Sequence, residues 1–325
     1  MRRVALRIDV DFPVGLRRGV PWLLDRLGER GMRATFFVVA GRNSGRRALR
    51  RTIDPDYLDR LRRLGPVRIV RCLGASLLRD EPFLESAEAR SALERILACG
   101  HELAAHGHDH AWWADEVWRA EPERLVEEVD RACDALERAS GARGIAWGAP
   151  GWRTTDVVMR QLERRGAPYL AECWGREPFQ TIDGAGRPIR VPHLPITAPS
   201  LEALALEGRH DAPSAVVSDL GAIADGDGVA VVCAHDYFEG LLRRDLFVAL
   251  LDRLVERGVE TIPLRSAARD LAAVIDELPP CRIVRAPVAG FHGFVSWQGP
   301  AVREASGESL AALAAHGAER RGDEE

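Results

Sequence analysis

The sequence predicts a single α/β domain whose parallel strands form a barrel or an open sheet. Short apolar runs of strand length recur along the 325-residue chain and alternate with amphipathic stretches of helical length. The first strand, the first helix and the second strand are complete by residue 40, and this βαβ order places consecutive strands parallel. No internal repeat and no change of composition marks a second domain.

The first strand covers residues 4–11, where apolar side chains occupy the even positions. Asp9 and Asp11 therefore share the other face, about 6.6 Å apart along the backbone at ~3.3 Å per residue. Phe12-Pro13 ends the strand, which places both acids at its carboxyl end, where α/β enzymes carry their chemistry. Buried carboxylates are costly unless they share a cation or a proton, so the pair indicates a functional site. The alternative is a strand end with two solvated acids.

The following elements continue the βα alternation. A helix is expected at residues 19–31, with Pro21 in its first turn and Gly31 at its end, and a strand at residues 34–40. Further strands are expected at residues 102–105, 145–147, 169–172, 189–194, 229–235 and 260–262, and helices at 122–139, 155–166, 245–258 and 264–275. The rest of 175–200 is expected to form loops. Residues 298–325, rich in Ala, Glu and Arg, are expected to be a disordered tail after one domain over 1–297.

Residues 42–98 form an insert that is long for a single crossover. A helix is expected after Asp54-Pro55, with Tyr57, Leu58, Leu61 and Leu64 on one face. The insert is also rich in arginine, at positions 42, 46, 47, 50, 51, 60, 62, 63, 68 and 71. A basic amphipathic helix of this kind is suited to an anionic bilayer or to a phosphate. The alternative is a solvated helical excursion that covers the barrel.

Composition excludes several classes of protein. With 46% hydrophobic residues, 29% charged residues and a net charge of −4, the chain is globular and is not expected to bind nucleic acid. The absence of lysine excludes Schiff-base chemistry. Six scattered cysteines without a Cys-x-x-Cys pair indicate reduced thiols. No signal peptide or apolar run of about 20 residues occurs, so we expect a cytoplasmic protein, with peripheral membrane contact left open.

Four histidines lie between Gly100 and His110. His106 and His110 are four residues apart, so on a helical turn they share one face, as two imidazole ligands of one metal do. An aspartate at the end of a neighbouring strand completes a set of two histidines and one carboxylate that leaves room for water and substrate. The alternative is a pair of exposed loop histidines, and His101 and His108 are expected to be structural.

His235 ends another apolar strand and is expected at the same edge of the sheet. Beside a metal and a spare carboxylate it is a natural general acid, whereas the alternative is a hydrogen-bonded wall residue. Glu172 ends a further strand, and Arg153 follows residues 149–152. Both are expected to tune His235 and Asp9 by pairing with them, and the alternative for each is an ordinary surface salt bridge.

Several motifs together are similar to those of one family. They are Asp9-Val-Asp11, Gly100-His-Glu followed by His106 and His110, Ala149-Pro-Gly-Trp-Arg153 and Cys233-Ala-His235. They resemble the polysaccharide deacetylase (NodB-homology, carbohydrate esterase family 4-like) superfamily. A further group of motifs resembles, within that superfamily, the 4-deoxy-4-formamido-L-arabinose-phosphoundecaprenol deformylases of the lipid A aminoarabinose pathway. They are Leu6-Arg-Ile-Asp-Val-Asp11, Arg18-Gly-Val-Pro21, His108-Asp-His-Ala-Trp112, Gly151-Trp-Arg153, Leu194-Pro-Ile-Thr197, Glu239-Gly240 and the arginine-rich insert. The likeness runs from about residue 3 to about residue 297.

The resemblance implies a distorted (β/α) barrel of about seven parallel strands with an inserted basic helical segment. It implies that Asp11, His106 and His110 hold a divalent ion, either Zn²⁺ or another first-row metal such as Mn²⁺, Co²⁺ or Ni²⁺. Asp9 is then the base that activates water, and His235 is the acid that protonates the leaving amine. The implied substrate is an undecaprenyl-phosphate-linked sugar with an N-formyl group, met at the cytoplasmic face of the inner membrane.

Two departures from the family pattern affect these expectations. Gly107 stands where the family usually has Ser or Thr, and Gly148-Ala-Pro150 stands where it usually has Arg-x-Pro. Arg153 is therefore expected to supply the missing guanidinium. Two alternative functions stay open: an N-deacetylase of another amino sugar or cell-wall glycan, and a catalytically silent sugar-binding barrel.

Overall fold

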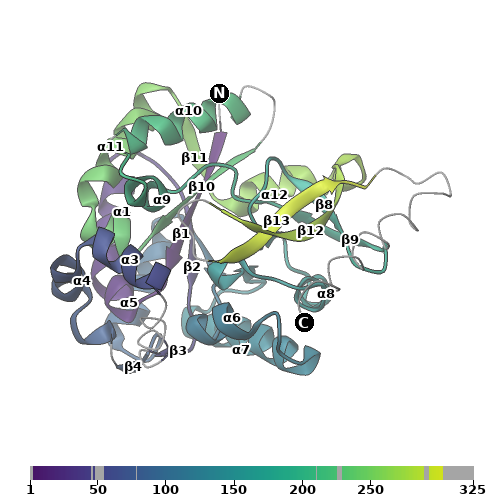
Figure 1. Ribbon diagram of the computed structural model, residues 1–325, viewed down its shortest axis with the longest axis horizontal. Helices are drawn as coiled ribbons and strands as arrows, with labels where there is room; N and C mark the ends of the chain where they lie inside the picture. Colours follow the sequence, from purple (N-terminus) through teal and green to yellow (C-terminus); the bar gives the residue numbers. More distant parts are fainter. Residues whose placement is uncertain are drawn as a thin grey trace.

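A curled, largely parallel sheet lies at the centre of the molecule. The computed structural model describes residues 3–44, 47, 55–77, 79–209, 211–224, 229–288 and 293–302. Seven strands form a parallel run, in the order β10 (Ala230–His235), β1 (Arg3–Val10), β2 (Thr35–Val38), β5 (Glu102–Ala105), β6 (Ala146–Gly148), β7 (Leu170–Ala171) and β9 (Pro188–His193). Figure 1 shows β10, β1 and β2 near the centre of the molecule and β9 to their right. The run confirms the predicted α/β class with about seven parallel strands. A short strand, β11 (Glu260–Ile262), also pairs in parallel with β1.

The two ends of the parallel run approach each other just beyond β9. The Thr197 N–H donates to the Val231 carbonyl of β10 at 3.1 Å, and the Val231 N–H donates to Thr197 Oγ1 at 2.9 Å. These two bonds replace a continuous ladder between β9 and β10, so the sheet curls into a distorted barrel with an interior.

Strand β1 shows how this interior is formed. Its even-numbered residues, from Val4 to Val10, join the large apolar core between the sheet and the helices. Ala5 instead joins a second apolar cluster inside the barrel with Phe37 and Val231. Because side chains alternate along a strand, Arg7 and Asp9 also face this interior, and both are buried.

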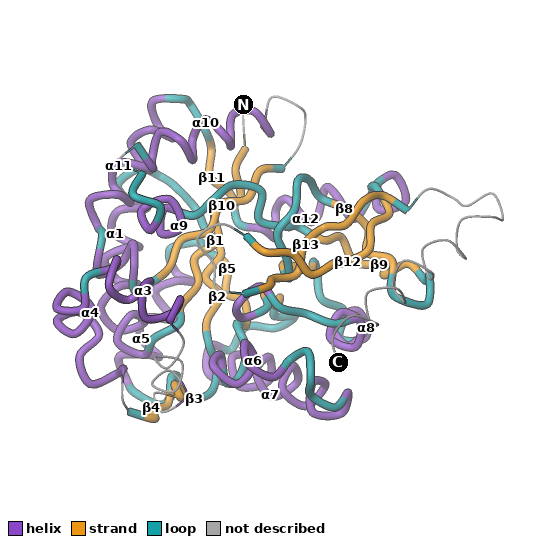
Figure 2. Tube along the Cα trace, viewed as in Figure 1, coloured by secondary structure: helices purple, strands orange, loops and turns teal. Residues whose placement is uncertain are grey.

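Helices surround the sheet, as the purple segments of Figure 2 show. They are α1 (Val20–Gly28), α5 (Ala87–Ala98), α6 (His110–Glu116), α7 (Pro122–Ser140), α8 (Asp156–Arg164), α9 (Leu201–Leu206), α10 (Ala212–Ala224), α11 (Arg244–Glu256) and α12 (Leu264–Ala272). The predicted helices at 19–31, 122–139, 155–166, 245–258 and 264–275 are confirmed with small shifts at their ends. Before α1, the chain forms a π-helical turn, η1 (Gly15–Gly19), and a second one, η5 (Phe238–Leu242), follows β10.

Several strands and helices of the described chain were not predicted. β8 (Phe179–Ile182) pairs antiparallel with β9, and β12 (Pro280–Pro287) and β13 (Phe294–Ala301) form an antiparallel hairpin beside it. Much of β12 is exposed, so it lacks the apolar alternation that reveals a half-buried strand. β13 runs four residues past the expected domain end at 297, and residues 303–325 lie outside the described part. α9 and α10 were missed as well.

The insert is a helical hairpin closed at its base by two short strands. β3 (Arg42–Ser44) pairs antiparallel with β4 (Asp80–Pro82), and α3 (Pro55–Leu64) and α4 (Pro66–Leu73) lie between them. Asp54 lies outside the described residues. α5 follows and packs on β5 and α7 as an ordinary crossover helix, so the departure from the βα rhythm is shorter than residues 42–98.

All six cysteines are free thiols, as expected from their spacing. Within the described ranges, no helix is both long enough and apolar enough to cross a membrane.

Candidate metal-binding and catalytic site

The predicted site residues meet at the carboxyl ends of neighbouring parallel strands. Asp9 is the next-to-last residue of β1, and Asp11 follows that strand directly. In the β1–β10 ladder Asp9 lies opposite His235, and His106 follows β5 on the other side of β2. Because parallel strands end at one edge of a sheet, residues about a hundred positions apart meet there.

Asp11, His106 and His110 form a compact set of potential metal ligands. Asp11 Oδ1 lies 3.5 Å from His106 Nε2 and 3.6 Å from His110 Nε2. One ligand atom from each of the three side chains falls within 4.8 Å of the others. Two imidazoles and one carboxylate at this spacing suit a first-row divalent ion with open positions for water and substrate.

The protonation of His106 fits a metal ligand. Its Nδ1 lies 2.8 Å from the Gly148 carbonyl oxygen, which can only accept, so Nδ1 carries the proton and Nε2 presents a lone pair toward Asp11. Burial lowers the pKa of His106 to about 4, against the opposing charges of Asp9 and Asp11. A neutral imidazole oriented through its second nitrogen is the form that binds metals.

The Asp11 carboxylate supports the same conclusion. Its Oδ1 is buried, yet it receives no hydrogen bond within the described part of the chain. A buried polar atom without a partner is costly, and a cation between Asp11 and the two imidazoles would satisfy it. The residues present therefore fit a divalent ion.

The backbone that carries His106 and His110 differs from the predicted helical turn. They were expected on one helical turn, but only His110 is helical, as the first residue of α6. His106 lies before Gly107, whose φ of +81° is in the region that favours glycine. A side chain at Gly107 would also meet Pro150 Cγ at 2.7 Å, which explains the departure from Ser or Thr. The bend brings the two rings to 5.2 Å between centroids.

The other two histidines of this segment do not point to the ion site. His101 Nδ1 accepts the Ala34 N–H at 3.1 Å and so joins two strands. His108 is half-buried, and a side chain at Gly41 would collide with its carbonyl oxygen at 2.2 Å. Neither is part of the ligand set, in agreement with their expected structural roles.

Asp9 is held by Arg7, a residue that the sequence analysis did not select. Arg7 Nε and Nη2 donate to the two carboxylate oxygens of Asp9 at 2.6 and 3.0 Å, and both side chains are buried. Burial opposes ionisation of Asp9, but the Arg7 guanidinium outweighs it and holds the pKa of Asp9 below its ordinary value. The signal was present in the sequence, because Arg7 interrupts an apolar strand two residues before Asp9 and thus shares its face.

The surroundings of Arg7 fix its guanidinium in place. It lies between the rings of Phe37 and Trp152, at 4.2 and 4.0 Å from their centroids, and Nη1 donates to the Ala171 carbonyl at 2.7 Å. A Cβ at Gly148 would come within 2.8 Å of Arg7 Nη1. The glycine that replaces the expected arginine of the third motif thus leaves the space that Arg7 fills.

The expected pairing of Arg153 with Asp9 is wrong. Arg153 Nε donates to the Phe294 carbonyl at 3.0 Å, its Nη1 donates to the Ala114 carbonyl, and its guanidinium lies over Trp118. Arg153 therefore ties the segment after β6 to α6 and β13. The guanidinium that we assigned to it belongs to Arg7.

Glu172 follows β7 (Leu170–Ala171) directly, near the expected strand end, but its partner is not the expected one. It is fully buried and accepts a hydrogen bond from Thr154 Oγ1 at 2.5 Å. Burial raises the pKa of Glu172 to about 8, against the opposing effects of Thr154 and Arg7. Its predicted pairing with His235 is wrong. The charge of Arg7 acts to lower the pKa of both Asp9 and Glu172, so Arg7 is the group that the two carboxyl groups share.

Two other glutamates surround His235, and neither was predicted to be its partner. Glu202 Oε2 lies 3.5 Å from His235 Nδ1 and Glu239 Oε2 lies 4.0 Å from it. Glu239 also accepts the His235 backbone N–H at 2.6 Å, and the Tyr237 hydroxyl contacts Glu202 at 2.7 Å. Burial lowers the pKa of His235, but the nearby carboxylates outweigh it, so the pKa of His235 is raised. Glu202 lies on α9 and Glu239 in η5, elements without a strong periodic signal.

Asp236 positions the loop that carries Asp11. Its carboxylate accepts the backbone N–H groups of Asp11 and Phe12, each at 3.1 Å. Its own N–H donates to the Asp9 carbonyl at 2.8 Å. A Cβ at Gly15 would lie 1.7 Å from Asp236 Oδ2, so η1 can pack on this carboxylate only because residue 15 is glycine.

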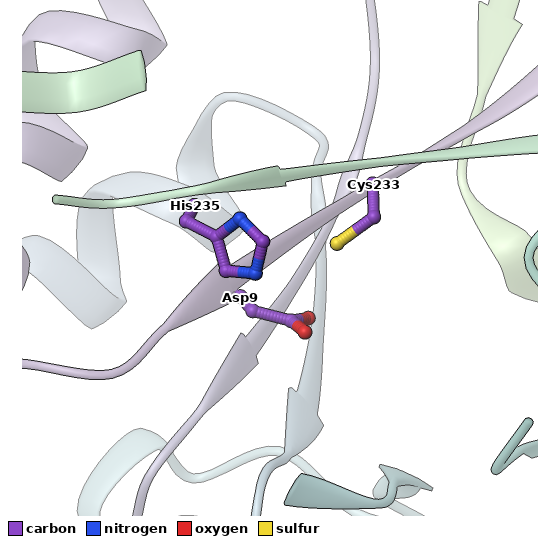
Figure 3. Close-up of side chains that lie close together, drawn as sticks. All are labelled: Asp9, Cys233 and His235. Atoms are coloured by element: carbon purple, nitrogen blue, oxygen red, sulfur yellow. The ribbon is translucent and has the colours of Figure 1, made fainter. Parts of the chain in front are cut away.

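A second set of potential ligands, Asp9, Cys233 and His235, is shown in Figure 3. Cys233 and His235 project from β10 toward Asp9. Burial and the Asp9 charge raise the pKa of the Cys233 thiol well above its ordinary value, whereas a metal ligand must be a thiolate. Asp9 is already paired with Arg7. The set around Asp11 is therefore the better cation site.

The curled parallel sheet gathers two carboxylates and three imidazoles at its carboxyl edge. A family model described as polysaccharide deacetylase matches residues 2–170, and the chain belongs to the polysaccharide deacetylase family. With the curated relatives described next, this membership makes the protein a hydrolase that acts on amide bonds.

Two curated proteins and one solved structure extend the comparison. A probable 4-deoxy-4-formamido-L-arabinose-phosphoundecaprenol deformylase, ArnD, from Shewanella sediminis (strain HAW-EB3) is 27% identical over 91% of this chain and 94% of its own. A probable enzyme of the same name from Wigglesworthia glossinidia brevipalpis is 22% identical over 88% and 98%. A crystal structure of a polysaccharide deacetylase homologue from Mycobacterium smegmatis superposes with a TM-score of 0.59 at 18% identity, covering 88% and 94% of the two chains, and it supports the fold.

Proposed function

We propose that this protein hydrolyses a sugar N-formyl group with the help of a divalent ion, releasing formate and a free amine. One observation carries the proposal: Asp9 and Asp11, at the carboxyl end of β1, share one imidazole but differ in their other partners. His106 Nε2 lies 3.5 Å from an oxygen of each acid. Asp11 also lies beside His110, whereas Asp9 is paired with a buried arginine and lies opposite His235. Two carboxylates whose surroundings differ in this way are suited to different tasks.

Asp11, His106 and His110 would hold the ion. A divalent ion in such a site supplies Lewis-acid chemistry, which makes a water more acidic and polarises a carbonyl group. Asp9 stays ionised because Arg7 lowers its pKa, so it can accept the proton of the attacking water. Arg7 acts through Asp9 and is a positioning residue.

His235 would serve as the general acid. When water has added to the formyl carbon, the C–N bond breaks only if the leaving nitrogen receives a proton. Glu202 and Glu239 raise the pKa of His235, so more of it is protonated near neutral pH. The proton passes from His235 to the nitrogen, and the products are formate and the amine.

The proposed substrate is 4-formamido-4-deoxy-L-arabinose linked to undecaprenyl phosphate, used in lipid A modification. The support is that two relatives, which match most of the chain, are named as probable deformylases of this substrate. A substrate with a polyprenyl tail stays in a bilayer, so the enzyme would act at the cytoplasmic face of the inner membrane and touch that membrane peripherally. An N-deacetylase is the second candidate, because the family model is described as polysaccharide deacetylase.

The test compares hydrolysis of the formylated lipid-linked sugar with hydrolysis of its N-acetyl analogue. We expect formate release to exceed acetate release by at least tenfold, to stop with chelator and to return on addition of Mn²⁺, Co²⁺, Ni²⁺ or Zn²⁺. Asp11→Asn should abolish turnover. The matched control, Asp25→Asn, changes an aspartate that pairs with Arg95 at the surface and should retain it. Preference for the N-acetyl analogue would overturn the formyl assignment.

A further inference from the structure

Helix α4 presents an unusual outer face. Val67 and Val70 are 72% and 62% exposed, more than the other exposed large hydrophobic residues of the described chain. The helix is anchored on its opposite side by Ile69 and Leu73, which are buried. Residues three apart on a helix are neighbours, so the two valines form one small apolar patch in contact with solvent.

Arginines surround this patch. Arg68 and Arg71 are exposed on the same helix, which contains no acidic residue. Within the described ranges neither arginine has an ion-pair partner, in contrast to Arg63 of α3, which pairs with Asp59 at 2.7 Å. Two exposed cations without an ion-pair partner and two exposed valines within five residues match the charge and the apolar surface of an anionic, amphipathic partner.

Further positive charge lies beside α4. Arg244, at the start of α11, lies 4.8 Å from the Trp22 ring centroid and donates to the Gly240 carbonyl at 2.8 Å. Burial and the neighbouring charge of Arg18 lower the pKa of Arg244, and Cys72 of α4 acts on the same group. Arg18 and Arg244 thus add positive charge next to α4.

This surface is attached to the rim of the catalytic site. Cys72 Sγ of α4 donates to the Leu241 carbonyl of η5 at 3.8 Å, and η5 begins three residues after His235. Arg63 of α3 donates to the Leu206 carbonyl of α9 at 3.1 Å, and α9 carries Glu202. Figure 1 shows α4 at the left edge of the molecule, outside α1 and α3. A partner bound to α4 would therefore lie on elements that contact η5 and α9, which carry the two glutamates beside His235.

We propose that α4 docks the enzyme on an anionic phospholipid bilayer, with Val67 and Val70 in the interfacial apolar region and Arg68 and Arg71 on the lipid phosphates. Amphipathic basic helices bind bilayers in this way, and arginine can extend its charged end to the head groups. Two exposed valines beside two exposed arginines suit a bilayer better than a nucleic acid, because binding to a nucleic acid would not require the valines. The inference refines the lipid-linked substrate of the proposed function by naming the surface that meets its membrane.

The test is sedimentation of the full chain with vesicles, measured without substrate so that its result does not depend on the reaction. Wild-type protein should sediment with phosphatidylglycerol–phosphatidylcholine vesicles and at least tenfold less with pure phosphatidylcholine vesicles. Val70→Ser/Arg71→Ser should reduce binding to the anionic vesicles at least fivefold, and high salt should reduce wild-type binding.

The matched control is Val255→Ser/Arg257→Ser, which removes an exposed valine and an exposed arginine from the end of α11 and its C-cap. This variant should bind vesicles as wild type does. Absence of wild-type binding to anionic vesicles, equal binding to neutral vesicles, or unchanged binding of Val70→Ser/Arg71→Ser would each overturn the proposal. Failure of formyl hydrolysis would instead reject the proposed function and leave this result standing.

Discussion

At the scale of single residues, the distinctive feature is which arginine supplies the guanidinium that pairs with Asp9. The arginine beside Asp9 comes from the same strand, two residues earlier, and it fills the space left by Gly148. Alternation along β1 places both side chains on one face, so the pair is built into the first strand. The remaining contacts of Arg7, with Phe37, Trp152 and Ala171, hold it there.

Arg7→Met should therefore impair catalysis through Asp9. Without the guanidinium the pKa of Asp9 rises, and because Asp9 must be ionised to act, the acid limb of kcat/KM should move to higher pH. We expect a loss of about 10²-fold or more at neutral pH, the usual contribution of a general base. Arg3→Met, at the exposed start of the same strand, is the control. An unshifted acid limb in a folded Arg7→Met variant would show that Arg7 has only a structural role.

Glu202→Gln tests the partner of His235. The Glu202 carboxylate raises the pKa of His235, so its removal should lower that pKa. His235 is active when protonated, and the alkaline limb of the rate profile should therefore move to lower pH. Glu256→Gln, at the exposed end of α11, should leave the profile unchanged. An alkaline limb that stays in place would exclude Glu202 as the group that tunes His235.

At the scale of elements, the π-helical turns η1 and η5 support the site from behind. η1 packs against Asp236, which receives two backbone N–H groups from the loop of Asp11. Neither turn follows a 3.6-residue period, so apolar spacing does not reveal them. For the same reason Glu239, within η5, was named only as part of a motif and not as a partner of His235, whereas Asp9 and His235, at the ends of regular strands, were assigned roles.

Gly15→Ala should destabilise the protein, because its new methyl group would lie 1.7 Å from Asp236 Oδ2. Overpacking of this kind costs about 1–3 kcal/mol. The matched control is Gly28→Ala in α1, where no heavy atom lies within 4 Å of the new Cβ, and this change should be neutral or stabilising by up to ~1 kcal/mol. Urea unfolding of both variants measures the difference. Equal free energies of unfolding would contradict the proposed packing of η1 on Asp236.

At the scale of the whole molecule, the sequence predicted the parallel strands and five of the helices around them, but not the antiparallel strands. Strands β2, β5, β6, β9, β10 and β11 are apolar and short, so period and length identified them. β12 and β13 form an edge hairpin with much exposed surface, and β12 also pairs with β8, a contact between distant segments that no local pattern encodes. The register that places Asp9 opposite His235 likewise depends on tertiary packing.

For the site, the sequence predicted the residues that meet at the edge of the sheet but not the residues that hold them. Asp9, Asp11, His106, His110 and His235 could be named because each lies at a strand end or in a dense motif. Their partners could not, since Glu202 and Glu239 approach His235 from separate segments. Arg153 was chosen for its place in a motif, but the direction of its side chain is set by backbone carbonyls of α6 and β13.

The central claim is that Asp11, His106 and His110 together hold one divalent ion. The most direct measurement is a titration of metal-free protein with Zn²⁺ or Mn²⁺, followed by calorimetry and by the rise in Tm that ligand binding produces. Wild type should bind one ion and gain stability. His106→Ala and Asp11→Asn should lose both effects, and His101→Ala should keep the stoichiometry. Unchanged one-to-one binding in His106→Ala and Asp11→Asn would contradict the account.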